Sequence, residues 1–224
     1  MRPAASKEAA LWIPARLHRF ALDVGSFVPE GFDAYARILH PLGKHGSDGN
    51  NTEVRWRDIA AANGRSVDDE LRLLDLSSEP GRLGPSGEVL WDMQSPVGSL
   101  PRDIAERLSQ TLGNHTRTPD QCLFAVWEGW GGLTSRTKAA PRFSVPGRDM
   151  LLFEGSISDA TTTVESVVWS WQSASLWWPD DRAWCVSTEI DFRWTYVGGS
   201  QACIDEVLHD ESLEAALVTP ATVR

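Results

Sequence analysis

The sequence predicts an α+β fold, in which a mostly antiparallel sheet in the second half of the chain carries helices packed on one side. The main observation is a series of short, nearly continuous apolar runs, as buried strands show, at 122–127, 150–153, 164–171 and 184–190. A second observation is that segments with helical spacing of apolar residues lie before and after these runs. Strands therefore cluster together, with helices at both ends of the cluster.

The first part of the chain is expected to add an arm, a strand and a helix to this sheet. Residues 1–14 are expected to form a flexible N-terminal arm, and Tyr35–His40 has the composition of a strand. Residues 43–51 are polar and rich in glycine, which predicts a loop. Thr52 is the expected N-cap of a helix that ends near Asn63.

The clearest helix is expected over 100–112, where Pro101 suits the first turn. Leu108 and its apolar neighbours at helical spacing would form the buried face of this helix. Near the end of the chain, Ser200 is the expected N-cap of a further helix, and a short turn is expected at Leu213–Leu217.

A chain of 224 residues is long enough for one large domain or two small ones. We expect residues 15–224 to form a single α+β domain. A break between two lobes, if the chain has one, would fall in the Pro-, Gly- and Ser-rich stretch 77–99.

The charge of the chain limits its partners. Its formal net charge is −10 and its pI about 4.9, which argues against nucleic acid and against anionic membrane surfaces, since both attract Lys and Arg. A basic protein partner would suit this charge. The three cysteines form no CxxC pair and the histidines show no metal spacing, so we expect no metal site and no cofactor. No segment approaches about 18 uninterrupted apolar residues, and we therefore expect a cytoplasmic location.

Six of the eleven tryptophans lie between Trp169 and Trp194. This density leaves three interpretations open: an unusual core, a ligand-binding wall or a protein interface. Trp177 and Trp178 cannot both point inward from one extended strand, so we expect one of them, Trp178, to border solvent. The candidate binding residues are Trp177, Trp178, Asp180, Asp181, Arg182 and Trp130.

Two carboxylates offer an alternative, catalytic interpretation. Glu128-Gly129 and Glu154-Gly155 each follow an apolar strand and lie near tryptophans. Paired carboxylates beside aromatic rings are the equipment of a glycan-cleaving site, with one acid and one ionised partner. The simpler interpretation is that both side chains are exposed at strand ends.

Several segments resemble hypothetical proteins from high-GC Gram-positive bacteria. The resemblance lies in Trp177–Val186 and Trp194–Ser200, and extends to Tyr35–Pro41, His115–Asp120 and Glu128–Trp130. It implies no particular activity. The size and acidity of the chain are also those of immunity proteins of bacterial toxin systems, although no residue motif links it to them.

The sequence therefore favours a non-enzymatic cytoplasmic protein whose acidic, Trp-rich surface inhibits or sequesters a basic partner. The alternative is a glycan-binding or glycan-hydrolysing protein that uses Glu128 and Glu154.

Overall fold

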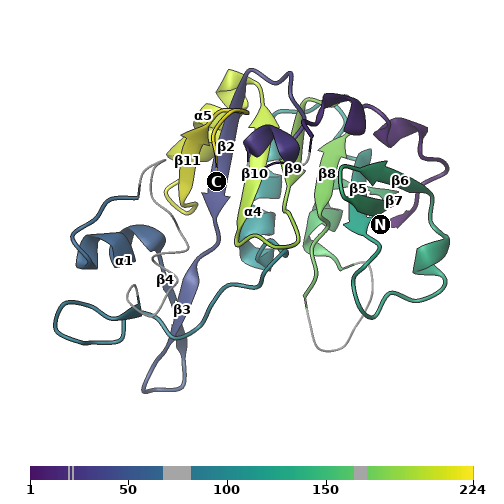
Figure 1. Ribbon diagram of the computed structural model, residues 1–224. Helices are drawn as coiled ribbons and strands as arrows, with labels where there is room; N and C mark the ends of the chain where they lie inside the picture. The colour runs from purple at the N-terminus through teal and green to yellow at the C-terminus, as the bar shows by residue number, and fades with distance from the viewer. Residues whose placement is uncertain (20, 22, 68–81, 164–170, 224) are drawn as a thin grey trace.

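A computed structural model describes residues 1–19, 21, 23–67, 82–163 and 171–223. Nine strands form one sheet in the order β1-β7-β5-β8-β9-β10-β2-β11, with β6 also paired to β7, and each pairing is antiparallel (Figure 1). The α+β prediction is thus confirmed. The strands of this sheet are β1 (Arg2–Pro3), β2 (Ala34–Leu39), β5 (Cys122–Trp127), β6 (Arg142–Val145), β7 (Arg148–Gly155), β8 (Leu176–Pro179), β9 (Trp184–Ser187), β10 (Trp194–Gly199) and β11 (Ala215–Val218).

The expected strands at 122–127 and 150–153 are confirmed as β5 and part of β7, which pair with each other. The run 184–190 is a strand only as far as Ser187. The run 164–171 lies outside the described residues except for Trp171.

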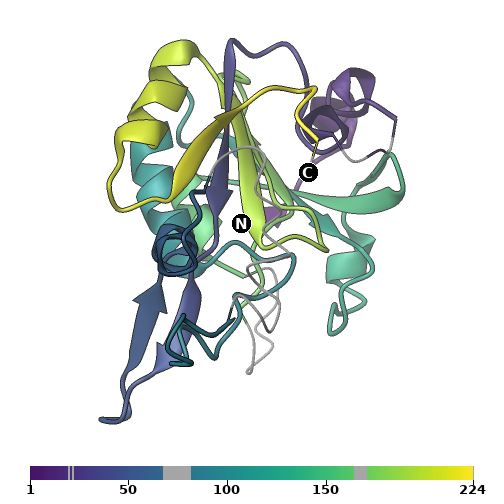
Figure 2. The ribbon, with the colours of Figure 1, turned by 60° about the vertical axis from the view of Figure 1, so that its left-hand side comes forward.

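Of the polar residues 43–51, only 46–50 form the expected loop. This loop joins β3 (Leu42–His45) to β4 (Asn51–Val54) in a hairpin that projects from the end of the sheet (Figure 2). Thr52 is therefore a strand residue and not an N-cap. The following helix, α1 (Trp56–Ala62), is capped instead by the distant carboxylate of Glu214, which accepts hydrogen bonds from the N–H groups of Trp56 and Arg57 at 2.8 and 2.6 Å.

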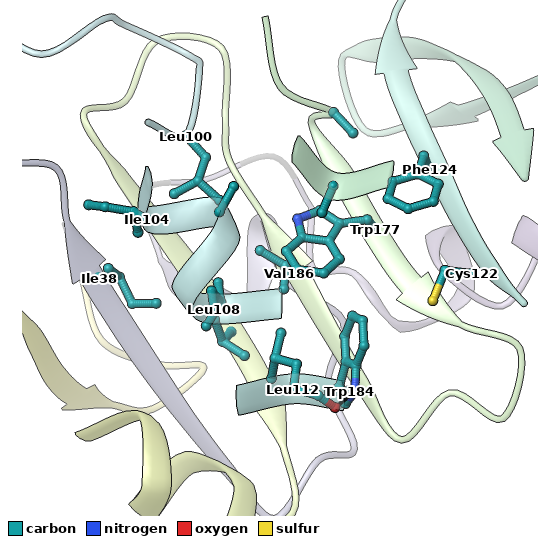
Figure 3. Close-up of a cluster of buried hydrophobic side chains, with 14 of the residues drawn as sticks. Ile38, Leu100, Ile104, Leu108, Leu112, Cys122, Phe124, Trp177, Trp184 and Val186 are labelled. Carbon is teal, nitrogen blue, oxygen red and sulfur yellow. Dashed lines mark hydrogen bonds between the residues drawn. The ribbon is translucent and has the colours of Figure 1, made fainter. Parts of the chain in front are cut away.

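Two helices, α4 (Arg102–Gly113) and α5 (Gln201–His209), lie on one face of the sheet, as predicted (Figures 1 and 2). The helix-side core is the buried cluster between them and the sheet (Figure 3). Within it, the indole Nε1 of Trp184 donates a hydrogen bond to the carbonyl oxygen of Leu112 at 2.9 Å, which links the end of α4 to β9. Figure 3 shows Ile38, Ile104, Leu108, Trp177, Trp184 and Val186 among its members.

The opposite face is covered by the beginning of the chain. Strand β1 pairs with β7, and short 3-10 turns follow at Glu8–Ala10 and Pro14–Arg16. Trp12 and Ile13 are only 8% and 0% exposed, and they pack in an N-terminal core with Trp178 and Leu152. The expected flexible arm over residues 1–14 is therefore wrong, because its apolar side chains cover one end of the sheet.

The other end of this face holds a third cluster, which we call the α1-side core. It joins Trp56 and Ile59 of α1 to Leu39 and Tyr196 of the sheet. Of the stretch 77–99, residues 82–99 are described. They are bonded to two parts of the chain, through the bridge of Met93 to Gly43 and through the N–H of Gly98 to the carbonyl oxygen of Phe192. Further 3-10 turns lie at Val24–Ser26, Thr137–Ala139 and Ile157–Thr161.

Candidate functional site

The two tryptophans expected to form a binding surface are both buried. Trp177 and Trp178 are 2% and 0% exposed. Adjacent residues of a strand point to opposite faces, and both faces of β8 are covered here, one by the helix-side core and the other by the N-terminal core. The expectation that Trp178 borders solvent is therefore wrong, and neither ring is an accessible anchor.

The polar residues after β8 form a structural turn. Asp181 accepts hydrogen bonds from Thr116 Oγ1 at 2.9 Å, from the Arg117 N–H at 2.8 Å and from the Ala183 N–H at 3.2 Å. Burial alone would raise the pKa of Asp181, but these hydrogen bonds outweigh it and lower the pKa. This carboxylate therefore holds the 116–118 loop against the turn.

Arg182 and Asp180, the residues on either side of Asp181, lie in different surroundings. Arg182 has a φ of 55° and places its guanidinium 5.4 Å from the ring centroid of Trp12, not over Trp177 or Trp178. Asp180 is exposed and lines a shallow cleft with Arg2 and Glu154.

Trp130 is half-buried and meets the ring of Trp127 edge-on, with 5.4 Å between the ring centroids. Arg148 lies over the other tryptophan of this pair, 5.8 Å from the Trp127 centroid, and forms an ion pair with Glu189 at 2.9 Å. Trp127 and Trp130 thus pack against each other, and both side chains remain partly exposed to solvent.

Glu128 and Glu154 do not form a catalytic pair. Because β5 and β7 are antiparallel, Glu154 lies opposite Leu123, whereas the N–H of Glu128 bonds to Asp149 at the far end of the same ladder. Five residues of strand separate the two positions, or roughly 17 Å, whereas a glycosidase holds its carboxyl groups about 5 to 9.5 Å apart. Each carboxylate has its own arginine: Glu128 pairs with Arg142 at 2.5 Å and Glu154 with Arg2 at 2.9 Å.

The feature best suited to binding lies at the β11 edge of the sheet, where a short turn at Leu213–Leu217 was expected. β11 is the last strand of the order and, within the described part of the chain, pairs with β2 alone. The Leu39 N–H donates to the Glu214 carbonyl oxygen, so by alternation the N–H and C=O groups of Ala215 and Leu217 point away from β2. The Leu217 side chain is 52% exposed.

A cleft of about 470 Å³ opens beside this edge. Two carboxylates, Glu30 and Asp33, are exposed along it, and its lining contains no Lys or Arg. We call it the β11 cleft. It is lined by Glu30, Gly31, Phe32, Asp33, Ala34, Tyr35, Gln201, Leu217, Val218, Thr219 and Pro220.

The wall of the β11 cleft is held by local hydrogen bonds. The Tyr35 hydroxyl donates to the Pro29 carbonyl oxygen at 3.2 Å and accepts from the Phe32 N–H at 3.1 Å. Burial raises the pKa of Tyr35, so the hydroxyl keeps its proton for this bond. A Cβ at Gly198 would lie 2.5 Å from the Phe32 ring, so this glycine allows the ring to pack on β10.

Among the described residues that line this cleft there is no cysteine or histidine. The three cysteines are buried free thiols, and burial raises the pKa of Cys122 and of Cys203 to about 12. Among the described residues, no group of three His, Cys, Asp or Glu side chains could hold a metal ion, and no helix is long and apolar enough to cross a membrane.

Comparison with known proteins found no match to the chain among protein-family profiles, curated proteins or solved structures. The β11 cleft is not among the sequence-predicted sites, which centred on the Trp-rich block. In the sequence, Pro29-Glu30-Gly31 has the composition of a turn, but this composition does not indicate a binding site. An edge strand and its neighbour become a site only through pairing between distant parts of the chain.

Proposed function

We propose that the protein binds a basic partner protein without catalysis, by adding an extended segment of that partner to β11. The supporting observation is the open edge of β11 beside the acidic β11 cleft. Outward N–H and C=O groups of Ala215 and Leu217 would pair with the backbone of an added strand. The proposed role is to sequester or inhibit that partner.

The chemistry of the β11 cleft favours a particular kind of segment. Asp33 attracts Lys or Arg, and Glu30 adds to this charge although its Oε1 also pairs with His18 at 2.7 Å. Exposed Leu217 and half-buried Phe32 offer apolar contact. A segment that alternates basic and apolar residues would meet both. The formal charge of −10 adds long-range attraction for a basic partner and repels nucleic acid and anionic lipid. The proposal places the protein in the cytoplasm, where buried thiols stay reduced.

A synthetic ten-residue peptide of alternating Lys and Val tests the proposal by fluorescence anisotropy, with a Glu/Val peptide as its counterpart. We expect the basic peptide to bind, its affinity to fall as salt rises, and the acidic peptide not to bind. The Asp33→Lys variant should weaken binding at least tenfold. Asp120→Lys changes the net charge equally but lies at the other end of the sheet, so it should bind as the wild type does.

A second variant tests the role of the edge. Leu217→Pro removes an N–H that points outward, so β11 should keep its ladder with β2 while an added strand loses a bond. We expect binding to be lost and the far-ultraviolet circular dichroism to be unchanged. A protein retained from native lysate by the wild type and not by Leu217→Pro would be the partner. Equal peptide affinities for the wild type, Asp33→Lys and Leu217→Pro would refute the proposal.

A further inference from the structure

An arginine, Arg37, is buried in the middle of the sheet, and it forms no ion pair with any residue that the structure describes. Arg37 is only 3% exposed, and it lies on β2 between Tyr196 of β10 and Ala216 of β11. Residues opposite each other across a ladder share a face, so the Arg37 side chain enters the α1-side core. Among the described residues, its buried Nε and Nη2 atoms have no hydrogen-bond partner.

The acidic residue directly before β11 already has other partners. Glu214 precedes Ala215, the first residue of β11, and its two carboxylate oxygens accept hydrogen bonds from the N–H groups of Trp56 and Arg57. Leaving a guanidinium buried and unpaired is strongly unfavourable. The position therefore calls for an anion that the described side chains do not supply.

The geometry of the free atoms identifies the chemistry of that anion. Nε and Nη2 lie on the same side of a guanidinium group, and their N–H bonds run nearly parallel. This is the fork that binds two oxygens of one carboxylate or phosphate group. Buried aromatic neighbours such as Tyr196 would strengthen the interaction by excluding water.

Arg37 lies one strand from the edge of the sheet. Only β11 separates Arg37 from that edge, and the residue that faces it there, Ala216, has a single methyl group and is half-buried. The Nε and Nη2 atoms themselves are shielded from solvent, so an anion would enter as this edge of the sheet opens. Glu30 and Asp33, which would repel an anion, line the β11 cleft at the end of β2 and not this position.

We propose that Arg37 is an anion-binding site that holds the carboxylate or phosphate group of a small ligand through Nε and Nη2. The site is independent of the proposed partner binding, because it uses the interior of the α1-side core and not the backbone of the edge.

Thermal unfolding in increasing sodium phosphate or sodium acetate, at constant ionic strength kept with sodium chloride, tests this site. We expect the Tm of the wild type to rise and saturate with the anion it binds, and the better of the two salts identifies the group. Arg37→Met should lose the saturable rise. Arg37→Lys keeps the positive charge but lacks the two parallel N–H groups. This variant should need at least tenfold more anion to reach half of the saturable rise in Tm.

The control is Arg117→Met, which removes an arginine whose side chain is 93% exposed. It should keep the saturable rise of the wild type, while any general salt effect on stability should appear in all variants. The proposal is wrong if the curves of the wild type and Arg37→Met coincide. If Arg37→Met does not fold, equal half-saturation for the wild type and Arg37→Lys would overturn it.

Discussion

Trp177 and Trp178 are consecutive residues of one strand, yet they are buried in two different cores on opposite faces of the sheet. Trp177 stacks on Phe124 at 6.3 Å between ring centroids, and Trp178 meets Trp12 edge-on at 6.0 Å. One strand thus joins the α4 side of the molecule to the N-terminal segment.

Replacing either tryptophan with alanine should therefore destabilise the protein by about 3–5 kcal/mol, the cost of a large cavity. Urea unfolding measures this loss. As a milder check, Trp177→Phe and Trp178→Phe should each remove a blue-shifted emission component that acrylamide does not quench. A loss below about 0.5 kcal/mol for Trp178→Ala would mean that this ring contacts solvent after all.

Ile104→Ala should cost about 2–4 kcal/mol, because Ile104 is 3% exposed and packs in the helix-side core (Figure 3). Gln110→Ala is the matched control, since Gln110 is exposed on the same helix. Urea unfolding of both variants gives the comparison, and equal stabilities would show that α4 does not anchor the core.

Asp181→Ala should destabilise the protein by about 1–3 kcal/mol, because three donors lose a common acceptor. The neighbouring exposed residue offers a control: Asp180→Ala should change the free energy of unfolding by about 0.5 kcal/mol or less. Similar losses for both variants would contradict the difference between these two carboxylates.

Burial lowers the pKa of His40 from 6.5 to about 3, so this histidine stays neutral in the folded protein. Below pH 6.5 the unfolded chain takes up a proton that the folded protein does not, and stability falls as the pH falls. From pH 6 to pH 5 the wild type should lose about 1 kcal/mol more than His40→Gln does. Chemical unfolding at several pH values measures the difference, and parallel curves would refute it.

His18 should show the opposite dependence. Its ring nitrogens lie 3.2 Å from Asp23 Oδ2 and 2.7 Å from Glu30 Oε1, and these two carboxylates raise its pKa above 6.5. The stabilisation is complete below pH 6.5 and is lost as the pH rises through the folded-state pKa. The stability advantage of the wild type over His18→Gln should therefore shrink between pH 6 and pH 9, whereas a constant advantage would exclude an ionic role.

The strands that could be predicted are those whose sequence is apolar throughout, such as Cys122–Trp127, because a strand buried on both faces needs no polar alternation. The hairpin around 43–51 and strand Ala215–Val218 could not be predicted in this way. The hairpin is defined by the pairing of β3 with β4, and Ala215–Val218 by its pairing with β2. Local composition does not report such partners.

The candidate site failed for a related reason. Alternation along β8 placed Trp177 and Trp178 on opposite faces, but only the packing of Trp12 and Ile13 shows that the second face is covered. In the same way, the repeated Glu-Gly at 128 and 154 suggested neighbouring strand ends, and the antiparallel direction of β5 and β7 separated them.

The rate at which each of the three buried thiols is alkylated reports how often the fold opens around that cysteine. The thiolate is the nucleophile that attacks an alkylating reagent. The pKa of Cys122 and of Cys203 is about 12, and burial also raises that of Cys185, so almost no thiolate is present while the fold is closed. Cys122 and Cys203 are buried in the helix-side core, whereas Cys185 is buried in the N-terminal core. The order in which iodoacetamide labels them would therefore record which face of the sheet is uncovered first.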